Sequence, residues 1–280
     1  MRPQMAARPV HLFEAGVITE QRLAGLAEAP AALGPAIAER LGCEKRVRIP
    51  FVPRDRLLTA ARDACRTLAD GVLASMRSGA TCGVIGGECT LVAGTLSGAL
   101  AAEPELHLVY FDAHGDFNTL ATTPSHFIGG MCLAHVCGRS IAPLLWPGSR
   151  KIADDRVALV GARALDPGEI GNLERSRVLR VPFDADRADA PGLVAFARRK
   201  RVWIHIDIDV VDPREFPAVS FPAPRGPSLA ALREVLRTVA SVADVCGFEL
   251  CAYDPRKDRD GTLVGPLVDV VSELMAPVAI

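Results

Sequence analysis

The sequence predicts an α/β fold of three layers (αβα), with helices packed on both faces of a mostly parallel central sheet. Two observations predict it. Short, nearly continuous apolar runs rich in β-branched residues recur along the chain, which is typical of strands buried on both faces. Longer segments with apolar residues at helical spacing alternate with these runs, and such alternation favours a parallel sheet covered by helices on both sides.

The elements follow from these patterns in chain order. Strands are expected at residues 82–86, 106–111, 156–160, 177–181, 202–208 and 247–252. Helices are expected at 54–77, 90–101 and 228–242, and Ser228 is a good N-cap for the last of them. The Pro- and Gly-rich stretch 212–227 is interpreted as a surface loop. Residues 1–280 are therefore expected to form a single domain.

Composition excludes several classes of function. The chain has 280 residues, 49% of them hydrophobic, which is enough for one large core. Its net charge of -1 and its 5% aromatic content do not suggest a nucleic-acid or anionic membrane partner. No apolar run approaches the roughly 20 residues of a membrane helix, and the N-terminus lacks a secretory apolar block, so a cytoplasmic protein is expected. The eight cysteines show no paired spacing and are expected to be free thiols.

Two clusters of ionisable residues follow predicted strands. Asp112, His114 and Asp116 come directly after the strand at 106–111, and Asp207 and Asp209 lie at the end of the strand at 202–208. In an extended segment alternate side chains share a face, so the members of each cluster can converge. Buried carboxylates repel one another, and divalent cations relieve this repulsion. Carboxylate and imidazole ligands together suit Mn²⁺.

Two other interpretations of these clusters are weaker. Each could be a strand end with solvated acids, but two such clusters, one with a histidine inside it, make this less plausible. A Mg²⁺-phosphate site would need a phosphate-binding loop, and neither G-x-x-x-x-G-K-[ST] nor G-x-G-x-x-G occurs. Gly86 and Gly87 do follow a strand, but Glu88 comes next, which is unsuited to an anion.

Three stretches resemble the signature motifs of the arginase/agmatinase (ureohydrolase) family. They are GGECT at 86–90, DAHGDFN at 112–118 and DIDVVDP at 207–213, and their order and spacing match as well. The resemblance runs from about residue 82 to the end of the chain. It implies a three-layer αβα fold, a binuclear Mn²⁺ site and hydrolysis of a guanidino-type amidine C–N bond.

The resemblance also implies a role for each metal ligand. Asp112 and Asp207 would bridge the two metals, Asp116 and Cys89 would complete one site, and His114 and Asp209 would complete the other. A metal-bridging hydroxide would be the nucleophile, since bound metal lowers the pKa of water. We expect the catalytic residues to be His114, Asp112, Asp209 and Cys89.

The expected substrate is a small amino acid. By the same resemblance, Asn118, Thr123 and Ser125 fall where arginase binds the α-carboxylate, and Asp166 falls where it binds the α-ammonium group. The alternative is that Asn118 and Ser125 are turn residues and that Asp166 caps a helix before Pro167, and both interpretations can hold together.

The chain departs from the family at three positions. Cys89 stands where the family has a metal-binding histidine, and a thiolate favours Zn²⁺ or Fe²⁺ or weakens one Mn²⁺ site. The alternative is an inert Cys89 and a missing metal. Gly129 replaces the histidine that shuttles protons, with His126 three residues earlier. Ala252 replaces the glutamate that contacts the guanidinium, and Glu249 lies on the opposite face of its strand.

These departures favour a guanidine derivative less basic than arginine. The Cys-for-His exchange resembles the N-omega-hydroxy-L-arginine hydrolase branch of the family, which makes hydroxyurea and L-ornithine in D-cycloserine biosynthesis. An arginase, another guanidino- or formimino-amino-acid hydrolase, and a metal-poor non-catalytic relative remain alternatives. Family members are often trimeric or hexameric, so the resemblance is compatible with a homo-oligomer, but the sequence does not indicate an interface.

Overall fold

An eight-stranded parallel sheet forms the centre of the protein. The computed structural model describes residues 8–52, 56–139, 149–185 and 189–275. The strand order is β2-β1-β3-β8-β7-β4-β5-β6, and all neighbouring strands run parallel. The strands are β1 (Val10–Ala15), β2 (Lys45–Arg48), β3 (Thr81–Gly86), β4 (His107–Phe111), β5 (Val157–Val160), β6 (Leu179–Val181), β7 (Arg201–Asp207) and β8 (Asp244–Cys251).

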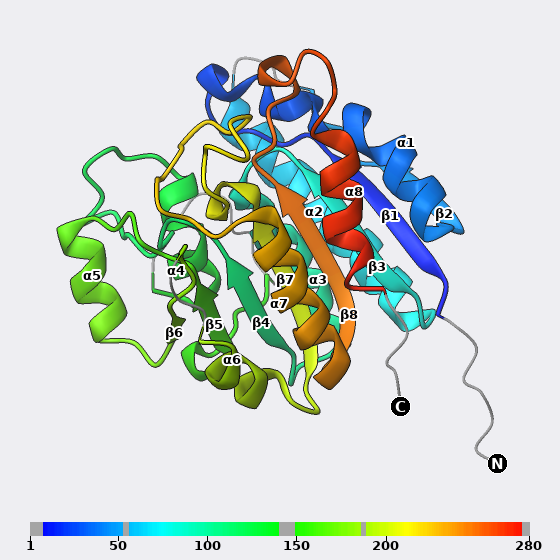
Figure 1. The fold of residues 1–280 in the computed structure, drawn as a ribbon. Helices are drawn as coiled ribbons and strands as arrows, with labels where there is room; N and C mark the ends of the chain where they lie inside the picture. The colour runs from blue at the N-terminus through cyan, green and yellow to red at the C-terminus, as the bar shows by residue number, and fades with distance from the viewer. Residues whose placement is uncertain (1–7, 53–55, 140–148, 186–188, 276–280) are drawn as a thin grey trace.

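Helices cover both faces of this sheet (Figure 1). They are α1 (Ala29–Leu41), α2 (Leu57–Arg77), α3 (Val92–Ala102), α4 (Cys132–Val136), α5 (Pro167–Glu174), α6 (Ala190–Ala197), α7 (Leu229–Val242) and α8 (Val264–Ser272). Helices α1, α6, α7 and α8 enclose one apolar cluster, and α2, α3 and α4 enclose another on the opposite face. The predicted three-layer αβα fold is confirmed.

The alternation within β4 explains why two cores form. Val109 and Phe111 pack into the cluster under α7 and α8, whereas Leu108 and Tyr110 pack into the cluster under α2 and α3. All four are fully buried. A strand whose two sets of alternate side chains are both apolar is stable only where helices cover both faces, which is the pattern that the sequence predicted.

All six predicted strands occur, with shifted ends, but β1 and β2 were not predicted. β2 is one of the two edge strands, and its residues Lys45, Arg46 and Arg48 are exposed. Their charged side chains carry no apolar pattern, and pairing with β1 together with an ion pair from Arg46 to Glu14 holds the strand in place. Charged residues on an edge strand also discourage pairing with other chains.

The three predicted helices correspond to α2, α3 and α7. Part of the first, at residues 54 and 55, lies outside the described residues. A 3₁₀ turn at Cys89–Leu91 precedes α3. Helices α1, α6 and α8 were not predicted from the sequence, whereas α5 begins at Pro167, directly after the helix cap considered at Asp166. Among the described residues, no helix combines the length and apolar composition that crossing a bilayer requires.

Ser228 caps α7 as predicted, because its Oγ accepts a hydrogen bond from the backbone N–H of Ala231 at 3.1 Å. We expect Ser228→Ala to lower the free energy of unfolding by about 1 kcal/mol, since an end donor of the helix loses its partner. Urea unfolding followed by circular dichroism measures this. Ser241→Ala, at the other end of α7, is the control and should cost less than half as much. Equal losses in both variants would contradict the capping role.

Candidate metal centre and adjoining pocket

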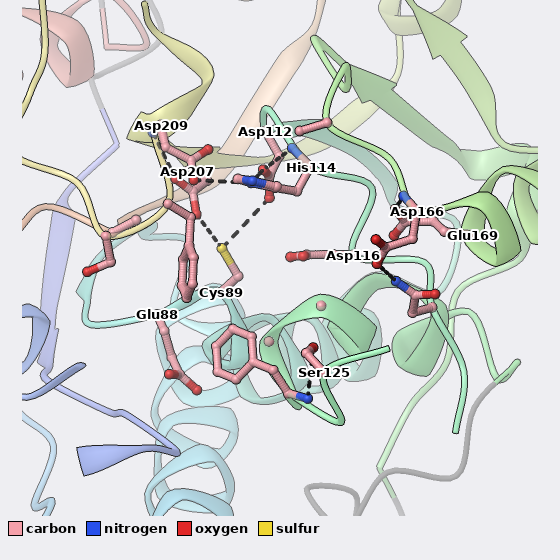
Figure 2. A pocket seen from close by; sticks show the side chains of 18 of the residues that line it. Glu88, Cys89, Asp112, His114, Asp116, Ser125, Asp166, Glu169, Asp207 and Asp209 are labelled. Atoms are coloured by element: carbon pink, nitrogen blue, oxygen red, sulfur yellow. Dashed lines mark hydrogen bonds and ion pairs between the residues drawn. The ribbon is translucent and has the colours of Figure 1, made fainter. Parts of the chain in front are cut away.

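The predicted metal ligands converge at the carboxyl ends of adjacent strands. Cys89 follows β3, Asp112 follows β4, and Asp207 ends β7. Because β3, β8, β7 and β4 are neighbours in the sheet, their ends meet at one edge. Figure 2 shows Cys89, Asp112, Asp207 and Asp209 gathered around one point, with the imidazole of His114 directed toward them.

The backbone brings Asp207 and Asp209 together in a way that the sequence did not predict. The strand was expected to continue to residue 208, with both carboxylates on one face. Instead β7 ends at Asp207, and Ile208–Val210 forms a 3₁₀ turn. The N–H of Asp209 donates to Asp207 Oδ1 at 2.8 Å, so a tight turn, rather than strand alternation, aligns the two carboxylates.

One group of donors is rich in oxygen and nitrogen. His114 Nδ1 lies 3.3 Å from Asp112 Oδ1 and 3.2 Å from Asp209 Oδ2. The backbone N–H of His114 donates to Asp112 Oδ1 at 2.6 Å, which fixes that carboxylate. The ligand atoms of Asp112, His114 and Asp209 are close enough to hold one cation.

Cys89 lies beside this group. Its Sγ is 2.8 Å from Asp207 Oδ2 and 3.9 Å from Asp112 Oδ2. Cys89, Asp112 and Asp207 form a second set of donors that could hold a metal. The thiol therefore lies in contact with the bridging carboxylates of the predicted site, although its role as a metal ligand stays a prediction.

Asp116 reaches the centre from the loop after β4, with a backbone φ of 47°. Its Oδ2 accepts hydrogen bonds from the hydroxyl of Tyr110 at 2.7 Å and from the thiol of Cys132 at 3.1 Å. Neither donor was predicted from the sequence. Tyr110 could have been found from its place two residues before Asp112 on a buried strand, whereas nothing in the sequence links Cys132 to Asp116.

Burial and mutual repulsion disturb the acids of the centre. The pKa of Asp112 is raised well above its usual value by burial and by the charges of Asp116 and Asp209. The pKa of Asp207 is raised by burial and by Asp209 and Asp112. Burial lowers the pKa of His114, but its contacts with Asp112 and Asp209 outweigh this and raise the pKa to about 11. Carboxylates that resist ionisation together, converging with an imidazole, fit divalent cations, which stabilise all of these charges at once.

A pocket of about 540 Å³ opens over the centre. Its walls include apolar residues such as Leu26, Phe127 and Phe221. Nine of the ten predicted metal- and substrate-binding residues line this pocket. Six are the predicted metal ligands, and the other three are Asn118, Ser125 and Asp166. The pocket therefore joins the metal centre to a polar group at its other end.

Asp166 is the anchor of that polar end. It forms a capping box with Glu169 at the N-terminus of α5, and its Oδ2 accepts a hydrogen bond from Asn118 Nδ2 at 2.8 Å. The helix-capping and pocket-lining interpretations of Asp166 thus hold together. Ser125 lines the pocket, and its Oγ accepts from the N–H of Phe127 at 3.3 Å. Thr123 is buried, and its Oγ1 accepts from the N–H of His126, so it supports the loop instead of lining the pocket.

The positions that depart from the family motifs also border the pocket. Gly129 and Ala252 both line it. Glu249 points to the buried histidine His205, at 2.7 Å, which agrees with the expectation that it cannot replace a residue at position 252.

Glu88 also lines the pocket, which was not predicted from the sequence. Its Oε1 accepts from the hydroxyls of Thr19 and Thr90. Burial raises its pKa to about 7 despite these hydrogen bonds. Its position next to Cys89 in the first motif was the available signal.

Comparison with known proteins identifies the class. The profile of the Arginase family matches residues 19–276, which extends further toward the N-terminus than the motifs indicated. The chain belongs to this family. It is accordingly a hydrolase that acts on amidine C–N bonds, and the predicted resemblance is confirmed.

Individual relatives differ in their named activities. The chain is 28% identical over 222 residues to N(omega)-hydroxy-L-arginine amidinohydrolase of Streptomyces lavendulae, covering 79% of this chain and 77% of the relative. It is also 28% identical over 243 residues to arginase of Bacillus caldovelox, covering 84% and 81%. The native crystal structure of the Bacillus caldovelox arginase superimposes with a TM-score of 0.87 at 25% identity, over 98% of this chain and 100% of that one.

The disturbed pKa values predict how metal removal affects stability. The pKa of Glu169 is raised from 4.5 to about 7, mainly by burial, so the folded state holds its proton more tightly and stability falls as the pH rises over that interval. The stabilising charge of His114 is fully present below 6.5 and is lost as the pH rises toward its folded pKa of about 11. Both effects have the same sign.

We therefore expect the melting temperature of chelator-treated protein to fall between about pH 6 and about pH 9. Adding Mn²⁺ should reduce this fall, because bound cations keep the carboxylates ionised. Thermal unfolding followed by circular dichroism, with and without chelator, measures both effects. A melting temperature that rises with pH in the metal-free protein would contradict the assignment.

Proposed function

We propose that the protein hydrolyses N-omega-hydroxy-L-arginine to hydroxyurea and L-ornithine with two Mn²⁺ ions, Zn²⁺ or Fe²⁺ being suited to the position beside Cys89. Water adds to the guanidino carbon, the bond from that carbon to the side-chain nitrogen breaks, and the released amine takes up a proton. The observation that carries the proposal is the pocket, which joins the metal centre to the Asn118–Asp166 pair and is bordered by Gly129 and Ala252. This activity would belong to antibiotic biosynthesis, as in the branch that the motifs resemble.

The amino-acid end of the substrate would lie against α5. The carboxylate of Asp166 is held by the capping box and by Asn118, so it is oriented before substrate binds. It would accept hydrogen bonds from the α-ammonium group. Ser125 lies on the same pocket and would donate its hydroxyl to the α-carboxylate. Thr123 would act indirectly by holding the loop through His126.

The reacting end of the substrate would lie near Ala252 and Gly129. A methyl group at position 252 offers no negative charge to a guanidinium, so the pocket gains little by binding a fully charged arginine side chain. N-hydroxylation makes a guanidine less basic, so this substrate enters more readily as a neutral group. It also leaves less need for a histidine at position 129 to assist departure of the amine.

The metals would be held by the donor groups already described. Asp112, His114 and Asp209 would hold one ion, and Cys89 and Asp116 the other, with Asp112 and Asp207 between them. When bound, such ions would activate water at neutral pH and stabilise the negative charge that develops on the atoms attached to the guanidino carbon. Tyr110 and Cys132 would keep Asp116 directed at its ion through their hydrogen bonds.

An ordinary arginase is the second candidate. Several relatives carry that name, and the Asp166 end of the pocket would serve L-arginine equally well. The two candidate substrates differ only in their guanidino group, so the residues around that group must discriminate between them.

The direct test is a steady-state assay of the purified protein with both compounds. We expect kcat/KM for N-omega-hydroxy-L-arginine to exceed that for L-arginine by at least about tenfold, which is a difference of about 1.4 kcal/mol in transition-state binding. Metal analysis of the same sample should give about two ions per chain. A preference for L-arginine would reject the proposal, and a metal-free, inactive protein would indicate a non-catalytic relative.

Exchange of Cys89 for histidine tests whether the thiol sets this preference. We expect Cys89→His to keep the metals and to shift the ratio of kcat/KM toward L-arginine, because a neutral imidazole replaces a charged, softer ligand. The control is Cys246→Ser, a buried cysteine whose Sγ lies 3.2 Å from the carbonyl oxygen of Val202 and away from the pocket. If neither variant alters the ratio, Cys89 does not determine the substrate.

A further inference from the structure

A second thiol lies directly beneath Cys89. Cys251 ends β8, opposite Asp207 in the neighbouring strand β7. Its Sγ lies 3.4 Å from the Sγ of Cys89, and both cysteines are buried. Cys89 lines the pocket and Cys251 does not, so the contact between the two sulfurs extends the group of possible ligands into the protein interior.

His205 supplies a nitrogen to the same place. Its Nε2 lies 3.7 Å from Cys251 Sγ, while its Nδ1 lies 2.7 Å from Glu249 Oε1. The ring also stacks on Tyr110, with centroids 3.8 Å apart and planes at 1°. A carboxylate that accepts the Nδ1 proton leaves the Nε2 lone pair directed at the sulfur, and this carboxylate–histidine pairing is the usual support of a metal-binding imidazole.

Glu249 has no other visible role. It is 1% exposed, and its Oε2 has no hydrogen-bond partner among the described residues. Burying a carboxylate with one oxygen left without a hydrogen bond costs free energy. The hydrogen bond to His205 is therefore the interaction that accounts for a glutamate at this position.

The spacing of the three donors fits a tetrahedral metal. Two sulfur ligands at about 2.3 Å from Zn²⁺ lie about 3.8 Å apart in a tetrahedron. The observed separations of 3.4 Å between the sulfurs and 3.7 Å between sulfur and nitrogen are close to this. The three ligand atoms lie within 4.8 Å of one another.

We propose that Cys89, Cys251 and His205 form a sulfur-rich metal position for an ion of the Zn²⁺ class, adjoining the oxygen-rich position of Asp112, His114 and Asp209. Asp207 Oδ2, 2.8 Å from Cys89 Sγ, is the neighbouring oxygen that would complete it. Cys251 and His205 would then take the place of Asp116 at the ion beside Cys89, and Asp116 would keep its hydrogen bonds to Tyr110 and Cys132. Thiolates select Zn²⁺, whereas carboxylates with one imidazole suit Mn²⁺, so the centre would hold two different metals. This inference goes beyond the proposed function, because it holds for any guanidino substrate.

The unmodified protein provides the first test. Metal-free, reduced full-length protein is loaded with one equivalent each of Zn²⁺ and Mn²⁺, and its zinc environment is measured by X-ray absorption. We expect two sulfur neighbours at about 2.3 Å and at least one imidazole nitrogen. One sulfur would assign Cys89 as the sole thiolate ligand and overturn the proposal, as would a zinc ion with oxygen and nitrogen ligands alone.

Cobalt substitution provides the second test, with a matched control. The near-ultraviolet charge-transfer band of Co²⁺ grows with the number of thiolate ligands, so Cys251→Ala should reduce it to about half. Cys246→Ala changes another buried cysteine of β8 and should leave the band unchanged. Equal bands in all three proteins would exclude Cys251 as a ligand.

Glu249→Gln tests the support of His205. Loss of the carboxylate should weaken Zn²⁺ binding by about 10–100-fold in a chelator competition, with Mn²⁺ binding changed much less. Equal weakening of both metals would assign Glu249 a general structural role and count against a separate zinc position.

Counting thiols separates metal binding from oxidation. The unfolded protein, prepared without reductant, should react with eight equivalents of thiol reagent, one for each cysteine. A count of six with a Cys89–Cys251 disulfide would overturn the proposal. The X-ray absorption and Co²⁺ measurements use no substrate. They therefore test the metal position even if the protein does not turn over N-omega-hydroxy-L-arginine.

Discussion

Repulsion among buried carboxylates is the constraint on which the rest of the centre depends. Asp112, Asp116, Asp207 and Asp209 are all buried at the ends of β4 and β7, which are neighbours in the sheet. Burying an unpaired carboxylate is costly, and burying four together is more so. Backbone N–H groups in the tight turns and the hydroxyl of Tyr110 lower this cost, but they do not neutralise the charge. The four buried carboxylates therefore destabilise the folded protein, and bound cations would remove this cost by neutralising their charge.

The two ends of the pocket are held by different structural elements. The metal end is set by the carboxyl ends of buried strands and by the short turns that follow them. The polar end is set by the N-terminus of α5, where Asp166 satisfies the helix and faces the pocket at once. Because both ends of the pocket are held by the protein's own hydrogen bonds, the proposed selectivity among guanidino compounds depends on lining residues such as Gly129 and Ala252.

The sequence predicted the parts of the centre that are local in the chain. Asp112, His114 and Asp207 lie at ends of strongly apolar strands, so both their position and their convergence follow from the general rule for parallel sheets. Cys251 and Cys132 could not be found in this way, because each becomes relevant only through the packing of separate elements against the acids. The edge strand β2 was missed for a related reason: backbone pairing, and not side-chain burial, stabilises it.

The three departures from the family motifs are coupled through charge. If the substrate is a weakly basic guanidine, a glutamate at position 252 would be left as an unpaired carboxylate beside four others. Ala252 removes that cost. Cys89 adds a negative charge of its own when ionised, and burial together with its contacts to Cys251 and Asp207 raises its pKa in the absence of a cation. A thiolate at this position is thus tolerated only where a metal binds it and where no further protein carboxylate, such as one at position 252, adjoins the four acids of the centre. Metal preference and substrate preference would then have changed together, because both respond to the same excess of negative charge.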